Sequence, residues 1–412
     1  MSDPSPLPAE PSDLSDLDAR LAQLRGGYER WRAAANAAAV RWEWYSAEAH
    51  DLRPLWYERD LRKPGRRLAE RPPLQRDHCR IGFDADGRPV AWLDHSGFPG
   101  GKLTEETYRD HSAGPEIVRE ARFRTGDGPI YLHEYRFEAG RIRSATAVAT
   151  RGGGYEEYEY TGDRVTRIRA YHGERTGGPG SRLHPAAPYQ VIDASYDGAG
   201  LSRLEITWPG PRRHVELRYE RPPAGYSLDA AIEVLRRALL RQVPAVAREM
   251  GIDEPAYCVA LGYFAADPVG VVVHVGLDSD RREWLAAQAE PDAPDEDTFV
   301  LWNPCDLHGL ETVDYGDAAK IARLLRQELQ LADAGFDTDA EAPSGVNEHV
   351  RHMLCQVAAE LNTVDWSAVL PVTDDFVVYA SDWQMVDFDR NLPECVPARQ
   401  ISCCASEVSC RR

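Results

Sequence analysis

Cys305, Asp306 and His308 are close neighbours whose side chains are of the types that thiol-dependent enzymes use. A cysteine nucleophile needs a base within about 3 Å to take its proton, and a histidine can serve. The three residues follow an expected strand over residues 298–302, and enzymes often carry polar groups just past a strand end. An Asn303–Pro304 turn explains the same segment without any chemistry. The segment supports one enzyme hypothesis, a hydrolase or thiol-dependent enzyme, beside a purely structural interpretation.

A second group of reactive side chains, His349, His352 and Cys355, lies in a helix predicted over residues 345–361. Imidazole and thiolate groups are zinc ligands. At about 100° per residue, however, His352 lies opposite the apolar stripe of this helix and His349 lies on its flank. Their spacing also differs from that of a helical HExxH zinc site. We therefore expect surface histidines, with metal binding by His349 and His352 as the alternative, and we predict no metal or cofactor.

Two glycine-containing segments would suit binding loops but lack the required ligands. A phosphate-binding P-loop at residues 97–104 would need a glycine where the chain has Ser96 and a hydroxyl where it has Leu103. A calcium loop starting at Asp84 would need a glycine at Pro89 and a carboxylate at His95. Both segments are therefore expected to be turns.

Charge is distributed unevenly along the chain. The 412 residues carry a net charge of -19; residues 1–225 hold 34 acidic and 34 basic side chains, whereas residues 226–412 hold 33 and 14. A negative field of this size repels nucleic-acid phosphates and anionic membranes and attracts basic proteins. We therefore expect a basic protein partner and neither nucleic-acid nor membrane binding. The alternative is that the charge only keeps the protein in solution.

Composition indicates a soluble chain of two or three domains, with 43% hydrophobic and 28% charged residues. The longest apolar run covers residues 269–277, far short of the roughly 20 residues of a membrane helix. The first residues lack the basic and apolar regions of a secretory signal. We therefore expect a cytoplasmic protein, and in that compartment the eight cysteines are expected to be reduced thiols. They show no paired C-x-x-C ligand spacing.

The first half of the chain is predicted to be a helical arm followed by a β domain. Residues 1–15 are expected to be disordered. Apolar residues at three- and four-residue steps predict a helix from residue 16 to about residue 50, within an arm over residues 16–74. From residue 75 to 225 the period changes to two, with glycine-containing turns, which predicts an antiparallel sheet of β-hairpins.

Residues 226–400 are predicted to form an acidic α+β domain, because turn chemistry, charge and period all change at residues 221–225. Ser227 can cap its first helix. The expected helices cover residues 229–250, 317–334 and 345–361, and the expected strands cover residues 257–265, 269–277, 298–302 and 376–380. This order favours an α+β sandwich with helices on one face of the sheet. The cysteine-containing tail, residues 401–412, is expected to be frayed.

Two resemblances add functional expectations. Residues 81–92, 135–142, 158–168 and 196–204 resemble the YD-repeat hairpins of Rhs-type proteins, although their spacing is irregular. The C-terminal domain is similar to uncharacterised bacterial domains of polymorphic-toxin systems, through Trp302-Asn-Pro, the helix pair that follows and the late strand. The second resemblance implies an immunity-type protein that masks a basic toxin with its acidic surface. A third hypothesis is that the β domain binds a glycan or cell-surface polymer through exposed tyrosines and tryptophans.

Overall fold

The computed structural model describes residues 27–74, 76–97, 100–125, 128–149, 152–174, 187–265, 267–288, 298–333 and 345–397. The expected disordered segment 1–15 and the cysteine-containing tail 401–412 lie outside these residues. The chain divides into two compact units: unit 1 is residues 1–221 with 333–339, and unit 2 is residues 222–332 with 340–412. Each unit is built on its own sheet, and the protein is α+β.

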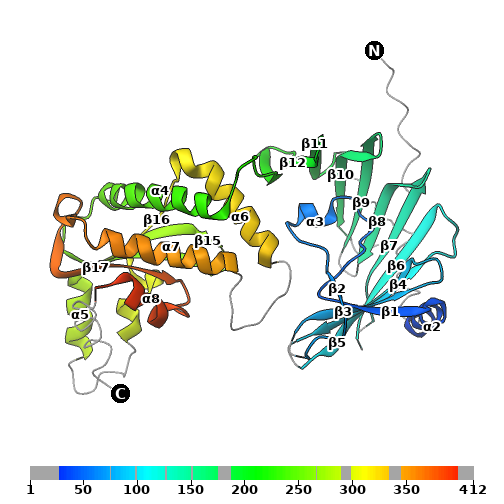
Figure 1. The fold of residues 1–412 in the computed structure, drawn as a ribbon, viewed down its shortest axis with the longest axis horizontal. Helices are drawn as coiled ribbons and strands as arrows, with labels where there is room; N and C mark the ends of the chain where they lie inside the picture. Colours follow the sequence, from blue (N-terminus) through cyan, green and yellow to red (C-terminus); the bar gives the residue numbers. More distant parts are fainter. Residues whose placement is uncertain are drawn as a thin grey trace, which may run out of the picture. The chain divides into compact units, whose positions relative to one another are not determined.

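Unit 1 contains a 13-stranded sheet in which β3 to β13 lie side by side in chain order, with β1 and β2 at one edge (Figure 1). Its strand pairs are antiparallel. The predicted hairpin sheet is therefore confirmed. Its strands are β1 (Arg41–Tyr45), β2 (Arg67–Leu68), β3 (His78–Phe83), β4 (Pro89–Ser96), β5 (Lys102–Asp110), β6 (Ile117–Arg124), β7 (Gly128–Glu138), β8 (Arg141–Ala149), β9 (Gly152–Thr161), β10 (Arg164–Glu174), β11 (Gln190–Asp197), β12 (Gly200–Trp208) and β13 (His214–Glu220).

The two faces of this sheet are covered by different segments. Helix α2 (Tyr28–Ala38) packs against β3, β4 and β5, and its Tyr28 contacts Tyr108 of β5. The next residue, Arg109, points to the opposite face because side chains alternate along a strand. There its guanidinium donates to the carbonyl of His50 at 3.3 Å. The segment between β1 and β2, which includes α3 (Trp56–Arg59), therefore covers the face that carries Arg109, called the inner face below.

The expected helix over residues 16–50 is wrong in its last part, and the residues before 27 lie outside the described ones. Helix α2 ends at Ala38, and β1 follows, with Trp42 opposite Gly82 of β3. Aromatic side chains favour strands because they pack well on a pleated surface. Gly82 makes the approach of Trp42 possible, since a Cβ there would lie 2.9 Å from its ring.

The predicted turns have the backbone conformation that glycine allows. Gly140 joins β7 to β8 with a φ of +76°, and Gly162 joins β9 to β10 with a φ of +59°. Glycine adopts these angles without the steric strain of a side chain. The relationship to YD repeats stays a prediction, because a sheet of hairpins can have other origins.

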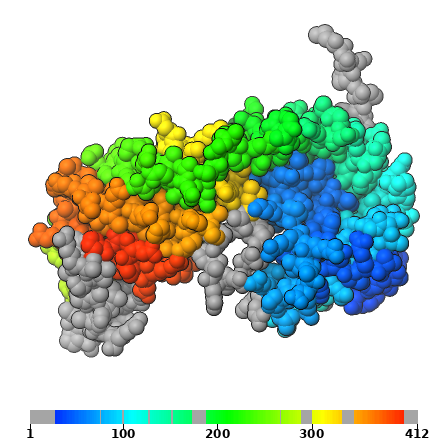
Figure 2. All heavy atoms as spheres, viewed as in Figure 1, coloured from blue at the N-terminus to red at the C-terminus, as the bar shows by residue number. Residues whose placement is uncertain are grey.

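Unit 2 contains a four-stranded sheet in the order β16-β15-β14-β17, with β14 and β17 parallel and the other pairs antiparallel. Helices α4, α7 and α8 adjoin one another across the face shown in Figure 2. Its elements are α4 (Leu228–Glu249), β14 (Ala256–Phe264), β15 (Asp267–Leu277), α5 (Asp278–Gln288), the 3-10 turns η1 (Thr298–Leu301) and η2 (Pro304–Asp306), β16 (His308–Thr312), η3 (Gly316–Ala318), α6 (Ala319–Asp333), α7 (Gly345–Leu361), η4 (Trp366–Ala368), β17 (Val372–Asp382) and α8 (Phe388–Cys395).

The helices and the hairpin predicted for this unit are confirmed, and Ser227 caps α4 by accepting from the backbone N–H of Ala230 at 3.3 Å. The sequence predicts helices packed on one face of the sheet, and the central strands are buried on both faces. The consecutive residues Val259 and Ala260 of β14 point to opposite faces and are both fully buried. Both faces of the central strands are therefore covered.

The strand expected over residues 298–302 is also wrong, since this segment forms η1. The hydroxyl of Tyr257 donates to the carbonyl of Leu301, and the hydroxyl of Tyr379 donates to that of Trp302 at 2.5 Å. These side chains satisfy backbone carbonyls that a strand would pair in a sheet. The strand of this region comes later, as β16.

Candidate functional site

The structure gives Asp306 and His308 partners other than Cys305. Asp306 accepts a hydrogen bond from the side chain of Asn303 at 2.8 Å. Nε2 of His308 lies 2.6 Å from a carboxylate oxygen of Asp280. A nucleophile–base pair needs the histidine to contact the thiol. The structure therefore does not arrange these three residues as a catalytic group.

Cys305 itself is exposed, and its Sγ donates to the backbone carbonyl of Trp383 at 3.7 Å. Partial burial and the negative charges of Asp306 and Asp382 raise the pKa of its thiol. Since the thiolate is the reactive form, Cys305 should react with iodoacetamide at pH 7 more slowly than free cysteine does. Peptide mass spectrometry after timed labelling checks this, and faster labelling than free cysteine would show an activated thiol.

The two histidines of α7, His349 and His352, have different hydrogen-bond partners. Nδ1 of His349 donates to the backbone carbonyl of Gly345 in its own helix. The ring of His352 lies between Glu394 and Gln356, each at 3.0 Å. Within the described ranges, no three histidine, cysteine, aspartate or glutamate side chains are arranged to hold a metal ion.

A group of carboxylates gathers where three elements of unit 2 meet. Ser279 at the start of α5 donates to Glu254 after α4 at 2.6 Å, and Asp280 of α5 pairs with His308 of β16. Gly309 of β16 lies beside the end of α4, since a Cβ there would be 2.9 Å from Sδ of Met250. We call the carboxylates on or next to these elements the acidic end: Glu249 of α4, Asp253 and Glu254 after it, Asp280 and Glu283 of α5, and Glu311 of β16.

These carboxylates face solvent rather than arginines. Glu249, Asp253, Glu283 and Glu311 are exposed, and no described residue forms an ion pair with them. By contrast, Arg281 of α5 forms ion pairs with Asp278 and Asp375. Four of the six carboxylates of the acidic end therefore carry a charge that no described ion pair compensates, which suits a surface that attracts a basic partner.

The inner face of unit 1 carries a buried polar network that sequence reasoning missed. Arg109 and Glu120 are both 5% exposed and form an ion pair at 2.6 Å. Tyr135 donates to Glu120 at 3.5 Å and bonds Nδ1 of His133 at 2.9 Å. Burial, together with the nearby positive charge of Arg53, lowers the pKa of His133 to about 4. His133 is therefore neutral at physiological pH. The pairing of β6 with β7 places Glu120 opposite His133, so both side chains lie on the face that carries Tyr135. Knowledge of this strand register is what would have predicted the network from the sequence.

The sign of glycan binding set out from the sequence was a row of exposed aromatic side chains. Among the described residues, the large hydrophobic side chains that are exposed include two aromatic ones, Tyr189 in unit 1 and Phe264 in unit 2. They belong to different units and form no row. Aromatic exposure therefore gives that hypothesis no support of the expected kind.

No protein-family model matches the sequence, and no curated protein is significantly similar to it. Within the described part of the chain, no helix combines the length and the apolar character needed to cross a membrane.

Proposed function

We propose that the protein is an interaction module whose unit 2 binds a basic protein through the acidic end. The uncompensated charge at the junction of α4, α5 and β16 is the observation that carries this proposal. The four exposed carboxylates that have no internal partner, Glu249, Asp253, Glu283 and Glu311, lose little on binding, because none of them has an ion pair that must break. They also attract a basic partner over a distance and favour one docking orientation.

The placement of the candidate reactive groups favours binding over catalysis. The thiol of Cys305 has a raised pKa and His308 is engaged by Asp280. A thiol-dependent enzyme would need the reverse arrangement, an activated thiol beside a free base. An immunity-type role, in which the acidic end masks a basic toxin, is one form that the proposed binding could take.

Neutralising the acidic end should weaken binding to the basic partner by about tenfold or more, because several close charge pairs would be lost together. The variant replaces the four exposed carboxylates without partners: Glu249→Gln, Asp253→Asn, Glu283→Gln and Glu311→Gln. The partner is first isolated by co-purification and identified, and its affinity for the purified proteins is then measured by calorimetry.

A matched control variant removes the same number of exposed carboxylates from other parts of unit 2: Asp229→Asn, Asp317→Asn, Asp374→Asn and Asp389→Asn. The proposal expects this control to bind almost as tightly as the natural protein. Equal loss in both variants would show that only net charge matters, and a partner without a basic surface would overturn the proposal.

A further inference from the structure

A small cavity opens on the inner face of unit 1. Its volume is about 100 Å³, and its floor consists of small residues on β8, β9 and β10: Ala145, Ala147, Gly154 and Ala170. These residues follow one another across the sheet, since Ala147 lies opposite Gly154 and Glu156 lies opposite Ala170. The space exists because these residues are alanines and a glycine, not because the strands separate.

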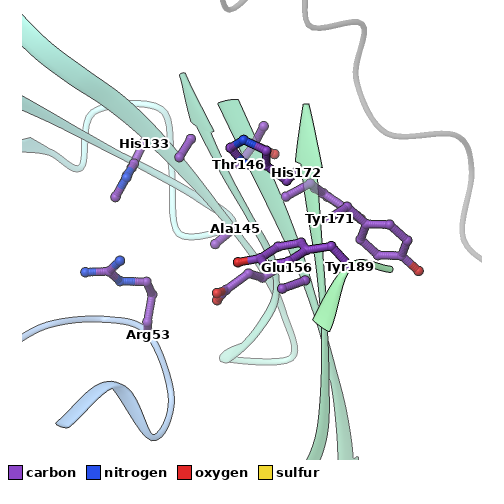
Figure 3. Close-up of a pocket in the computed structure, with 12 residues that line it drawn as sticks. Arg53, His133, Ala145, Thr146, Glu156, Tyr171, His172 and Tyr189 are labelled. Carbon is purple, nitrogen blue, oxygen red and sulfur yellow. The ribbon is translucent and has the colours of Figure 1, made fainter. Parts of the chain in front are cut away.

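Polar side chains surround this floor. Figure 3 shows the guanidinium of Arg53, the imidazole of His133, the carboxylate of Glu156 and the hydroxyl of Tyr189 around one space, whereas Tyr171 points away from it. Tyr189 is 46% exposed, so the cavity opens to solvent beside its ring. The lining therefore combines a buried polar end with an aromatic ring at the mouth.

Charges around the cavity compensate one another in pairs. Arg53 pairs with Asp51 at 2.6 Å, and Arg59 pairs with Glu156 at 2.5 Å. Although burial alone would raise the pKa of each carboxyl group, the paired arginines hold both pKa values below their usual range. The neutral His133 adds no charge. A charged ligand therefore gains no net attraction from this lining.

Some hydrogen-bonding capacity remains unused. His133 is 8% exposed, and no described residue bonds its Nε2, since its one hydrogen bond uses Nδ1. Arg53 donates to Asp51 through Nε and Nη2, and no described residue accepts from its Nη1. Glu156 accepts two hydrogen bonds from Arg59 and one from the hydroxyl of Tyr158, and one of the roughly four lone-pair sites of a carboxylate remains. Since the hydroxyl of Tyr135 donates to Glu120, Nδ1 of the neutral His133 ring donates to Tyr135 and its Nε2 accepts. The cavity thus offers a guanidinium donor, a carboxylate acceptor and an imidazole acceptor.

We propose that this cavity binds one edge of a neutral sugar residue, with the hydroxyl groups of that edge bonded to Arg53, His133 and Glu156 and one ring face on Tyr189 at the mouth. Hydroxyl groups both donate and accept, so they match this mixed set, as an ammonium or a carboxylate does not. The proposal goes beyond the docking function of unit 2 and depends on none of its residues.

Saturation-transfer NMR with the full chain tests it, using glucose, galactose, mannose and N-acetylglucosamine as probes. Glucuronic acid and glucosamine serve as charged counterparts. At least one neutral sugar should give transfer signals at millimolar concentration, and its charged counterpart should give weaker ones. Absence of binding by all four neutral sugars, or stronger binding of the charged ones, overturns the proposal.

Cavity-filling variants locate the binding. Ala147→Leu places a larger side chain on the floor and should abolish the signals, whereas Ala149→Leu on the same face of β8, outside the cavity, should keep them. Tyr189→Ala, at an exposed position, should reduce affinity at least fivefold without affecting folding. Signals that survive Ala147→Leu place the sugar elsewhere and contradict the proposal.

The same measurement with di- and trisaccharides of the sugar that binds identifies its source. Tighter binding of the longer chains indicates the end of a glycan, and equal binding indicates a free monosaccharide. Either result is compatible with the proposed chemistry, and only binding lost on filling the cavity counts in its favour.

Discussion

Replacing Arg109 by alanine should destabilise unit 1 by about 3–5 kcal/mol, because it leaves the carboxylate of Glu120 buried without its cation. The two side chains are 2% and 6% exposed, and two guanidinium nitrogens lie 2.6 and 3.1 Å from one carboxylate oxygen. The guanidinium also lies 4.3 Å from the centre of the Trp92 ring, so its loss removes packing as well. Hydrogen exchange of unit 1 peptides, measured during urea unfolding, gives the change in the free energy of unfolding.

An exposed ion pair in the same sheet provides the control. Arg141 pairs with Asp163, and their side chains are 46% and 92% exposed. Arg141→Ala should therefore change the unfolding free energy by about 1 kcal/mol at most. If both substitutions had the same small effect, Glu120 would be solvated rather than buried on the inner face.

The second large effect is expected at Trp302 in unit 2. Its side chain is 2% exposed, and its ring centre lies 5.7 Å from those of Tyr257 and Tyr379. Trp302→Ala should lower the unfolding free energy of unit 2 by about 3–5 kcal/mol, because the remaining cavity cannot fully collapse. Hydrogen exchange of peptides from β14 and β17 during urea unfolding measures the loss.

Leu310 of β16 is the matched control, because it is 66% exposed. Leu310→Ala should change stability by no more than about 0.5 kcal/mol. Unit 1 peptides should show the same exchange in both variants. If the Trp302→Ala protein were as stable as the natural one, Trp302 would not be packed against Tyr257 and Tyr379 of the sheet.

Local sequence signals were sufficient where an element buries a regular pattern of its own residues. Helix α4 has a serine cap and an apolar stripe, and α7 has the bounds that its periodicity predicts. The hairpin turns were equally readable, since glycine at the turn and alternation in the flanking strands both depend on neighbouring residues. These features do not need contacts between distant parts of the chain.

Prediction failed where distant residues decide the local conformation. The stripe through Trp31 and Ala35 continues to Trp42, yet Trp42 joins a sheet because Gly82, forty residues later, leaves room for its ring. Likewise, residues 298–302 look like a strand, but hydroxyl groups from Tyr257 and Tyr379 hold the segment as a 3-10 turn. Such contacts cannot be read from periodicity within one segment.

The two sites were predictable to different degrees. Net charge located the acidic part of the chain, but only the fold shows that the loop after α4, helix α5 and strand β16 meet, through the contacts of Glu254 and Asp280. The cavity of unit 1 had no sequence signal, because alanines and glycines in strands are common and carry no chemistry of their own. Its floor becomes visible only when the strand register aligns them.

The central claim, electrostatic docking by the acidic end, is tested most directly by the salt dependence of binding to the identified basic partner. The dissociation constant is measured between about 50 and 500 mM salt, where the screening length falls from roughly 14 to 4 Å. The account predicts steep weakening for the natural protein and a clearly shallower dependence for the variant that lacks Glu249, Asp253, Glu283 and Glu311 carboxylates. An affinity independent of salt, or the same slope in both proteins, would contradict it.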